Sequence, residues 1–196
     1  MRMKMMAAVL VCAMSVAGVA QTAAVTKVDP AKSMDALLSG VEADLVPLVE
    51  AMPAEKFDFA PTADFFKSAG PEYKGVSTFG AMVGHIVQAH YFFFLQAQGK
   101  SMEGADPAVL KAMQGAPKLK TKAELVQALK DSFAYGHVAA STLTAENAWD
   151  HVGRGATDTR AGWLALAAAH DRDHYGQLVE YLRMQGKIPP ASQPKK

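Results

Sequence analysis

The chain has 196 residues, of which half are apolar and a fifth are charged. These values fit one globular domain with a sizeable core and exclude a disordered or collagen-like chain. Twenty basic residues stand against 19 acidic ones, and they do not cluster into the basic stripe that is typical of nucleic-acid-binding proteins, so no nucleic-acid partner is expected.

The N-terminal segment has the layout of a secretory signal peptide. Arg2 and Lys4 precede an uncharged stretch over 5–19, and small residues stand just before a cleavage point at Gln21. The uncharged stretch is short for a membrane-spanning helix, which needs about 20 apolar residues, although an uncleaved anchor is the alternative. We predict a signal over 1–20, export to the periplasm or the extracellular space, and no stable membrane insertion after cleavage.

The single cysteine lies inside this segment. Cys12 follows bulky residues rather than the small ones that precede a lipidated cysteine, so no lipid anchor is expected. Cleavage would remove it together with two basic residues, which changes the net charge from +1 to 18 − 19 = −1. The mature protein would then have no disulfide and no thiol of its own, and any thiol chemistry would use a thiol supplied by the substrate.

Four segments carry apolar residues at spacings of three and four, which predicts helices, and no stretch shows sustained strand alternation. The first helix covers about 30–52, and a long loop follows over 57–75. The second has Ser77 as its N-cap and ends near Gly99. A long connection over 100–120 comes next, with a short helix near its middle.

The third helix opens with Thr121 and Glu124, which form a capping-box motif. The fourth covers about 160–185 and ends at a glycine followed by prolines. Four amphipathic helices bury their apolar faces most simply as a bundle. We therefore predict an all-α, four-helix bundle domain over 30–190 and a disordered tail over 191–196.

Two histidines stand on the predicted inner face of the fourth helix. That face follows alternating spacings of four and three: Trp163, Ala167, His170, His174, Gln177, Tyr181 and Met184. His170 and His174 lie one turn apart, separated by about 40° around the axis, so both imidazoles can bind one ion. The alternative is two buried histidines, each of which would need both a donor and an acceptor in an apolar place.

A third ligand would come from another segment. Periodicity slightly favours His90, which falls on the apolar line of the second helix, whereas His85 lies on the flank of that helix. The pattern alone leaves this choice open. We expect His137 to be satisfied by hydrogen bonds and His151 to be solvated.

Three stretches of the chain carry a family resemblance. The stretches over 77–91, 170–183 and 186–190, of which the His170 segment H-x3-H-Y-G-Q-L is the most specific, resemble the DinB-like (DinB/YfiT) superfamily. The likeness covers about 34–190. It implies an up-down-down-up bundle with a long crossover between the second and third helices.

The resemblance also implies a divalent metal site made by His85, His170 and His174, while His90 matches no ligand position. Three imidazoles leave one position of a tetrahedral ion open, as in catalytic zinc sites. Zinc or nickel is favoured, and iron, copper and manganese also suit nitrogen ligands. Asp171 is a candidate to orient a ligand's second nitrogen, and Gln177 is a candidate to position water or substrate.

The sequence is compatible with three functions. The first is a metal-dependent transferase or hydrolase acting on a small molecule or a thiol. The second is an exported, stress-related metal-binding protein without catalysis, and the third is a metal-free helical interaction module. Family members with known activities use thiols of the cytosol, so an export signal departs from that pattern. No general base is identified.

Four consecutive aromatic residues, Tyr91 to Phe94, occupy the second helix. A helix cannot turn all four side chains toward one face. Burial against the long loops and a homodimer interface are the two alternatives that would account for them.

Overall fold

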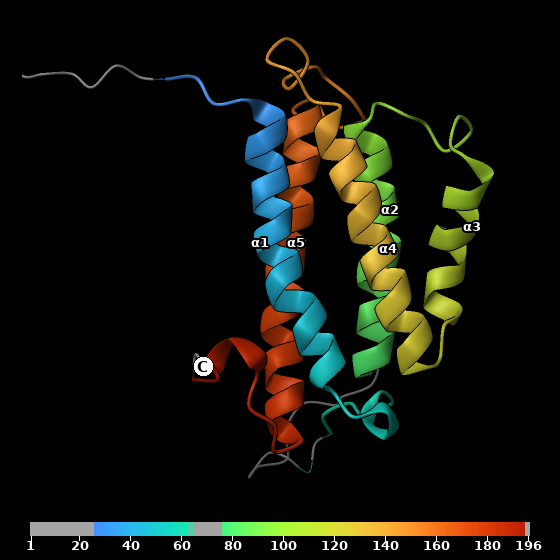
Figure 1. Ribbon diagram of the computed structural model, residues 1–196. Coiled ribbons are helices and arrows are strands. Elements are labelled where there is room, and N and C mark those ends of the chain that lie inside the picture. Colours follow the sequence, from blue (N-terminus) through green and yellow to red (C-terminus); the bar gives the residue numbers. More distant parts are fainter. Residues whose placement is uncertain (1–25, 63, 65–75, 195–196) are drawn as a thin grey trace, which may run out of the picture.

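The computed structural model describes residues 26–62, 64 and 76–194, so the predicted signal peptide over 1–20 lies outside the described residues (Figure 1). Over these ranges the chain is helical and forms no strand, which confirms the predicted all-α class. The described α-helices are α1 (Pro30–Ala51), α2 (Phe79–Ala97), α3 (Pro107–Gly115), α4 (Lys122–Ser141) and α5 (Arg160–Met184).

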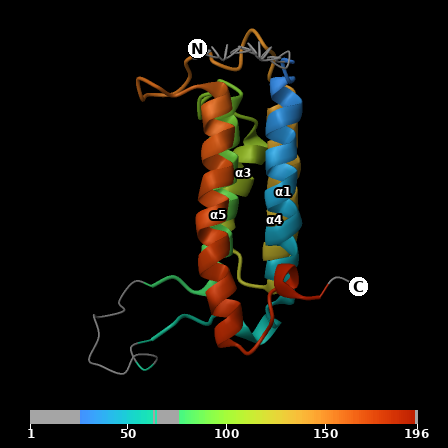
Figure 2. The same ribbon diagram turned by 90° about the vertical axis from the view of Figure 1, so that its left-hand side faces the viewer.

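The four long helices lie side by side (Figures 1 and 2). α1 and α2 each pack against both α4 and α5. α1 and α5 begin at the same end of the molecule, whereas α2 and α4 begin at the other end (Figure 1). Because α2 and α4 run in the same direction, the connection between them must return the length of α2, and α3 lies on this return path.

Local sequence signals set the helix ends. Thr121 and Glu124 form the predicted capping box, in which Thr121 Oγ1 accepts from the Glu124 N–H at 3.2 Å and Glu124 Oε2 accepts from the Thr121 N–H at 3.0 Å. The N-cap of α2 is Thr78 rather than the predicted Ser77, because Thr78 Oγ1 accepts from the Ala81 N–H. The Ser77 carbonyl instead accepts from Tyr181 of α5.

The buried face of α5 differs from the predicted one. Its most buried residues are Ala161, Leu164, Ala167, Ala168, Asp171, Leu178, Tyr181 and Leu182. Gln177 and Met184 of the predicted stripe are exposed, and both His170 and His174 are partly exposed. Spacings of three and four also describe the line through Leu164, so periodicity did not distinguish two stripes that lie about 100° apart.

The aromatic run on α2 is largely covered by the chain itself. Tyr91 and Phe94 are buried and pack against Tyr135 of α4. Phe93 stacks on Trp163 of α5, with ring centroids 5.8 Å apart. Phe92, which is 39% exposed, is the one member of the run that presents a large apolar surface.

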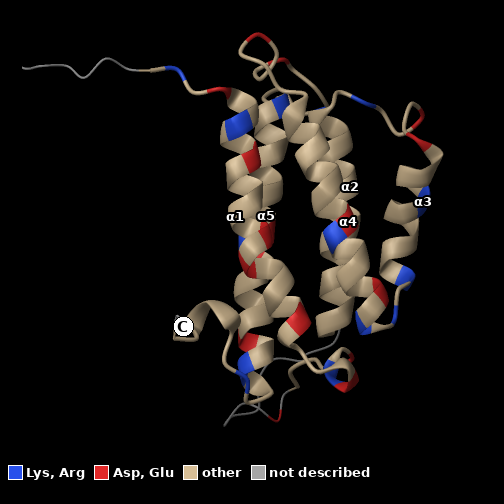
Figure 3. Cartoon of the chain, viewed as in Figure 1, with Lys and Arg blue, Asp and Glu red and all other residues tan. Residues whose placement is uncertain are grey.

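Basic and acidic residues are interspersed along the helices in Figure 3. The part of the chain that the structure describes contains no helix that is both long and apolar enough to cross a membrane. The tail, predicted to be disordered from 191, begins with a 3₁₀ turn over Pro190–Ser192 that contacts α1.

His137 links α4 to α1. Its Nδ1 lies 2.7 Å from an oxygen of Asp35, and its Nε2 lies 3.0 Å from an oxygen of Glu42. The prediction of a hydrogen-bonded histidine is therefore confirmed. Burial opposes the charged ring, but the hydrogen bonds and charges of both carboxylates outweigh it and raise the pKa of His137 above 6.5.

Glycine allows a close contact between α2 and α4. A Cβ added at Gly136 would lie 2.6 Å from the fully buried ring of Phe94. We expect Gly136→Ala to lower the free energy of unfolding by about 1–3 kcal/mol, because the ring has no room to move. Gly176→Ala is the matched control, since its Cβ would meet nothing within 4 Å, and it should stabilise by about 0.5–1 kcal/mol. Equal changes in urea unfolding would contradict this packing.

The raised pKa of His137 predicts a pH-dependent contribution to stability. The folded chain holds this proton more tightly than the unfolded chain, so the contribution is fully present below the unfolded pKa of about 6.5 and is lost as pH rises through the folded pKa. We expect the difference in unfolding free energy between the wild type and His137→Gln to be largest near about pH 6 and smaller near about pH 9. A difference that grows with pH would refute the assignment.

Candidate metal centre

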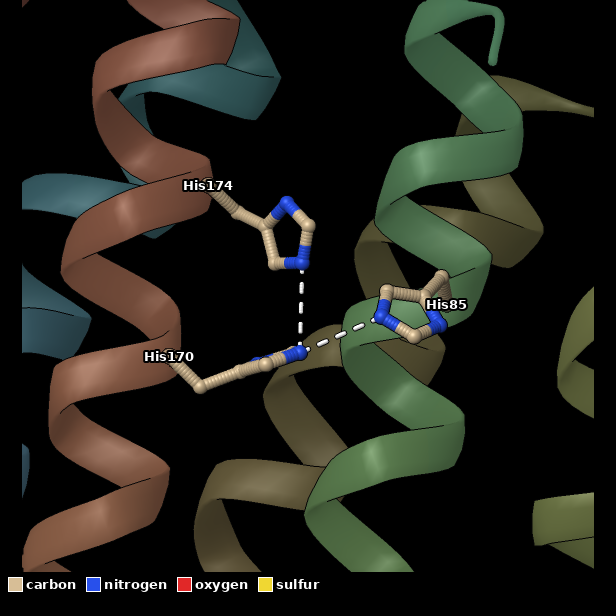
Figure 4. A group of neighbouring side chains, drawn as sticks. All are labelled: His85, His170 and His174. Atoms are coloured by element: carbon tan, nitrogen blue, oxygen red, sulfur yellow. Dashed lines mark hydrogen bonds between the residues drawn. The ribbon is translucent and has the colours of Figure 1, made fainter. Parts of the chain in front are cut away.

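His85 of α2 meets His170 and His174 of α5 where these two helices pack (Figure 4). One nitrogen of each ring lies within 4.8 Å of the others, and no further His, Cys, Asp or Glu of the described ranges joins the group. The Nε2 of His170 is 3.1 Å from Nε2 of His85 and 3.2 Å from Nε2 of His174. The structure therefore brings together all three predicted ligands.

The spacing of these nitrogens fits a shared ion. A neutral Nε2 carries either one hydrogen or one lone pair, so His170 Nε2 can satisfy only one of its two neighbours. A divalent ion would accept a lone pair from all three rings. Tetrahedral coordination with bonds of about 2.0–2.1 Å places ligand nitrogens about 3.3 Å apart, close to the separations in this cluster. The three histidines can therefore hold a first-row divalent metal.

Gln177 selects the tautomer of His174. The Gln177 amide nitrogen donates to a carboxylate oxygen of Asp173 at 3.0 Å. The other atom of this amide, Gln177 Oε1, therefore faces His174, whose Nδ1–H donates to it at 3.1 Å. With the proton on Nδ1, the lone pair of His174 is on Nε2, the atom directed at the other histidines (Figure 4). Gln177 is exposed, and this contact orients the ring of His174.

The environment favours the neutral form of His85 and His174. Burial lowers the pKa of His85 below 6.5, and the neighbouring His170 and His174 lower it further. Burial and then His170 also lower the pKa of His174, against the smaller opposing effect of Gln177. Neutral imidazole is the form that binds metal, so these two side chains are ready to bind at neutral pH.

His90 lies outside the cluster and is fully buried. Its Nδ1 is 2.8 Å from Ser132 Oγ, and its Nε2 lies 2.8 and 2.9 Å from the two carboxylate oxygens of Asp171. Both ring nitrogens are used, so this ring has no lone pair for a metal. The periodicity that favoured His90 reflects burial alone. The fully buried Ser132 supplies one of the polar partners that a buried histidine requires, and no local sequence pattern pairs it with His90.

The carboxylate of Asp171 contacts His90 rather than one of the three clustered histidines. Its Oδ1 lies 3.8 Å from Nδ1 of His170, which is too long for a hydrogen bond. The buried Nδ1 of His170 has no hydrogen-bond partner among the described residues. Burial opposes ionisation of Asp171, but His90 and His170 outweigh it and lower the pKa of the carboxyl. The structure thus assigns the predicted orienting carboxylate to another histidine.

Comparison with protein families identifies the DinB superfamily. The profile of the DinB superfamily matches residues 37–178, a span that is well over half of the chain and contains all three clustered histidines. No curated protein matches the chain.

Gln177→Ala tests how the ring of His174 is held. Loss of the Oε1 acceptor should weaken metal affinity by about 10–100-fold, because the ring loses its fixed tautomer and orientation. Stoichiometry at saturating metal should stay at that of the wild type. Gln177→Glu, which keeps an acceptor oxygen, should lose less. Competition with a chelating dye measures these affinities, and an unchanged affinity in Gln177→Ala would contradict the positioning role.

Proposed function

Because the chain belongs to the DinB superfamily, we propose that it is an exported protein that binds one divalent metal ion through His85, His170 and His174. The observation that carries the proposal is the convergence of three Nε2 atoms at 3.1 and 3.2 Å. The four long helices would form the up-down-down-up bundle of the family. Their directions in Figure 1 and the long return path through α3 support this topology.

Three protein ligands leave at least one coordination position for water or for a small ligand. When bound, the ion would supply a Lewis acid that lowers the pKa of a coordinated water or thiol. The three histidines would hold it, and Gln177 would keep one of them in the correct tautomer. Zinc or nickel is our first choice, and iron, copper and manganese are alternatives because imidazole suits several metals.

The activity that such an open site would support is thiol transfer or hydrolysis on a small molecule. A second function, metal binding without catalysis in a stress-related role, is favoured by one observation. The nearest buried carboxylate, Asp171, has both oxygens on His90, and so it is not free to act as a general base. Turnover that disappears with a chelator would distinguish the enzyme from this alternative, and absence of any bound metal would leave a helical interaction module.

Export and homodimerisation are two further parts of the proposal. The basic, apolar and small-residue order over 1–20 supports a signal peptide and a periplasmic or extracellular location. Homodimerisation is supported by the exposed ring of Phe92, while its aromatic neighbours pack within the chain. The balanced charge of the chain supports a partner other than nucleic acid.

Elemental analysis of the mature protein, after loading and dialysis, tests the metal site. We expect about one divalent ion per chain. Loss of that ion is expected in His85→Ala, His170→Ala and His174→Ala. His90→Gln should keep it, because the glutamine amide can still donate to Asp171 and the residue lies outside the cluster. Circular dichroism of each variant confirms that the helices remain folded.

Affinity should also depend on pH. Because the pKa values of His85 and His174 lie below 6.5, binding should persist somewhat below that pH and then fall as the rings are protonated. A wild-type protein that stays metal-free in excess zinc, nickel and copper would refute the proposal. If His90→Gln loses the ion while His85→Ala keeps it, the ligand assignment is wrong.

A further inference from the structure

A cavity of about 390 Å³ adjoins the histidine cluster where α2, α3 and α5 meet. Its walls include two of the three clustered histidines and five other residues: His85, His170, Gln88, Ala89, Phe92, Phe93 and Met113. His174 does not line it. The cavity therefore opens on a side of the cluster that the third histidine leaves free, and a ligand that completes the shell of an ion can approach from there.

The walls beyond the histidines are almost wholly apolar. Phe92, Phe93 and Met113 supply two rings and a thioether, and Gln88 is the one other polar side chain. Among the described residues, no Lys, Arg, Asp or Glu lines this cavity. A charged or sugar-like body placed here would give up part of its hydration to walls that offer few hydrogen bonds in return. The walls thus favour an apolar body.

The size of the space and its aromatic lining favour a planar body. An apolar cavity of about 150 Å³ is large enough for benzene, so this one holds a ring with substituents. The Phe93 ring meets His170 edge to face, with centroids 5.3 Å apart, and it stacks on Trp163 behind. Aromatic faces and a methionine sulfur make favourable contacts with a flat ring.

The wall of the cavity that α3 forms is positioned by a close backbone contact with α2. A Cβ at Gly84 would lie 2.9 Å from the carbonyl oxygen of Ala116, so glycine lets the end of the crossover rest directly on α2. In the sequence, Gly84 immediately precedes His85, and Ala116 lies three residues after Met113. Met113 is only 8% exposed and forms one wall of the cavity as part of the packed fold.

We propose that this site takes a ligand made of an anionic donor group on a planar apolar body, of the class of aromatic carboxylates and aryl thiolates. The donor atom completes the coordination shell at the three histidines, and the ring lies among Phe92, Phe93 and Met113. Gln88 is the neutral polar side chain available to the donor group. This inference rests on the proposed function and deepens it by naming the substrate class.

Isothermal titration of the zinc-loaded mature protein with benzoate and with acetate tests the proposal. The two anions share a donor group and differ in the ring. Benzoate should bind at least tenfold more tightly than acetate to the zinc-loaded protein, and removal of zinc by a chelator should weaken benzoate binding. Equal affinities for the two anions, or benzoate binding that is unchanged without zinc, would overturn the proposal.

Ala89→Leu locates the ring in this cavity. The larger side chain fills the space, so the preference for benzoate should disappear while zinc content and acetate affinity stay at wild-type values. Ala165→Leu makes the same change at an exposed position of α5 outside the cavity, and it should leave the preference intact.

Zinc content, measured on each sample, separates the two proposals. One zinc per chain without a benzoate preference overturns the ligand class and leaves the metal site standing. A preference that survives in Ala89→Leu overturns the assignment to this cavity. Absence of zinc from the wild type overturns the metal site and, with it, the ligand that would complete the shell.

Discussion

A buried polar chain joins three of the four long helices. Ser132 of α4 contacts His90 of α2, and His90 donates to the carboxylate of Asp171 on α5. All three residues are fully buried. Removal of one partner from such a buried pair typically costs about 3–5 kcal/mol, because it leaves a polar or charged group without compensation. Their mutual satisfaction therefore selects one register of α2 against α5.

That register places the candidate ligands. α2 and α5 run in opposite directions (Figure 1), so a step from His90 back to His85 on α2 corresponds to a step forward from Asp171 on α5. His85 then faces His170 and His174 across the helix contact. A slip of one turn, about 5.4 Å, would separate these nitrogens and would also break the buried pair. One interaction thus constrains both the core and the site beside it.

Histidine makes different contacts in each of three environments of this helical fold. The fully buried ring has both nitrogens bonded and joins helices, while His137 at the surface lies between two carboxylates that favour its charged form. In the cluster, burial lowers the pKa of His85 and His174, and one nitrogen from each of the three rings converges on the same space. Only that last environment combines converging ring nitrogens with an adjoining apolar cavity. The surroundings therefore decide which histidines are able to bind a metal.

The sequence by itself determined the helices, the capping box at Thr121 and the pairing of His170 with His174, because these depend on neighbours within one or two turns. Tertiary structure alone decided the rotation of α5, since two stripes on that helix satisfy the same spacing and only packing against α1 and α2 selects one. It also decided the role of His90. Periodicity indicates that the position of His90 is buried. The partners of its two ring nitrogens, Ser132 and Asp171, lie 42 and 81 residues away in the sequence. No local pattern contains that information, because those contacts exist only once the helices pack.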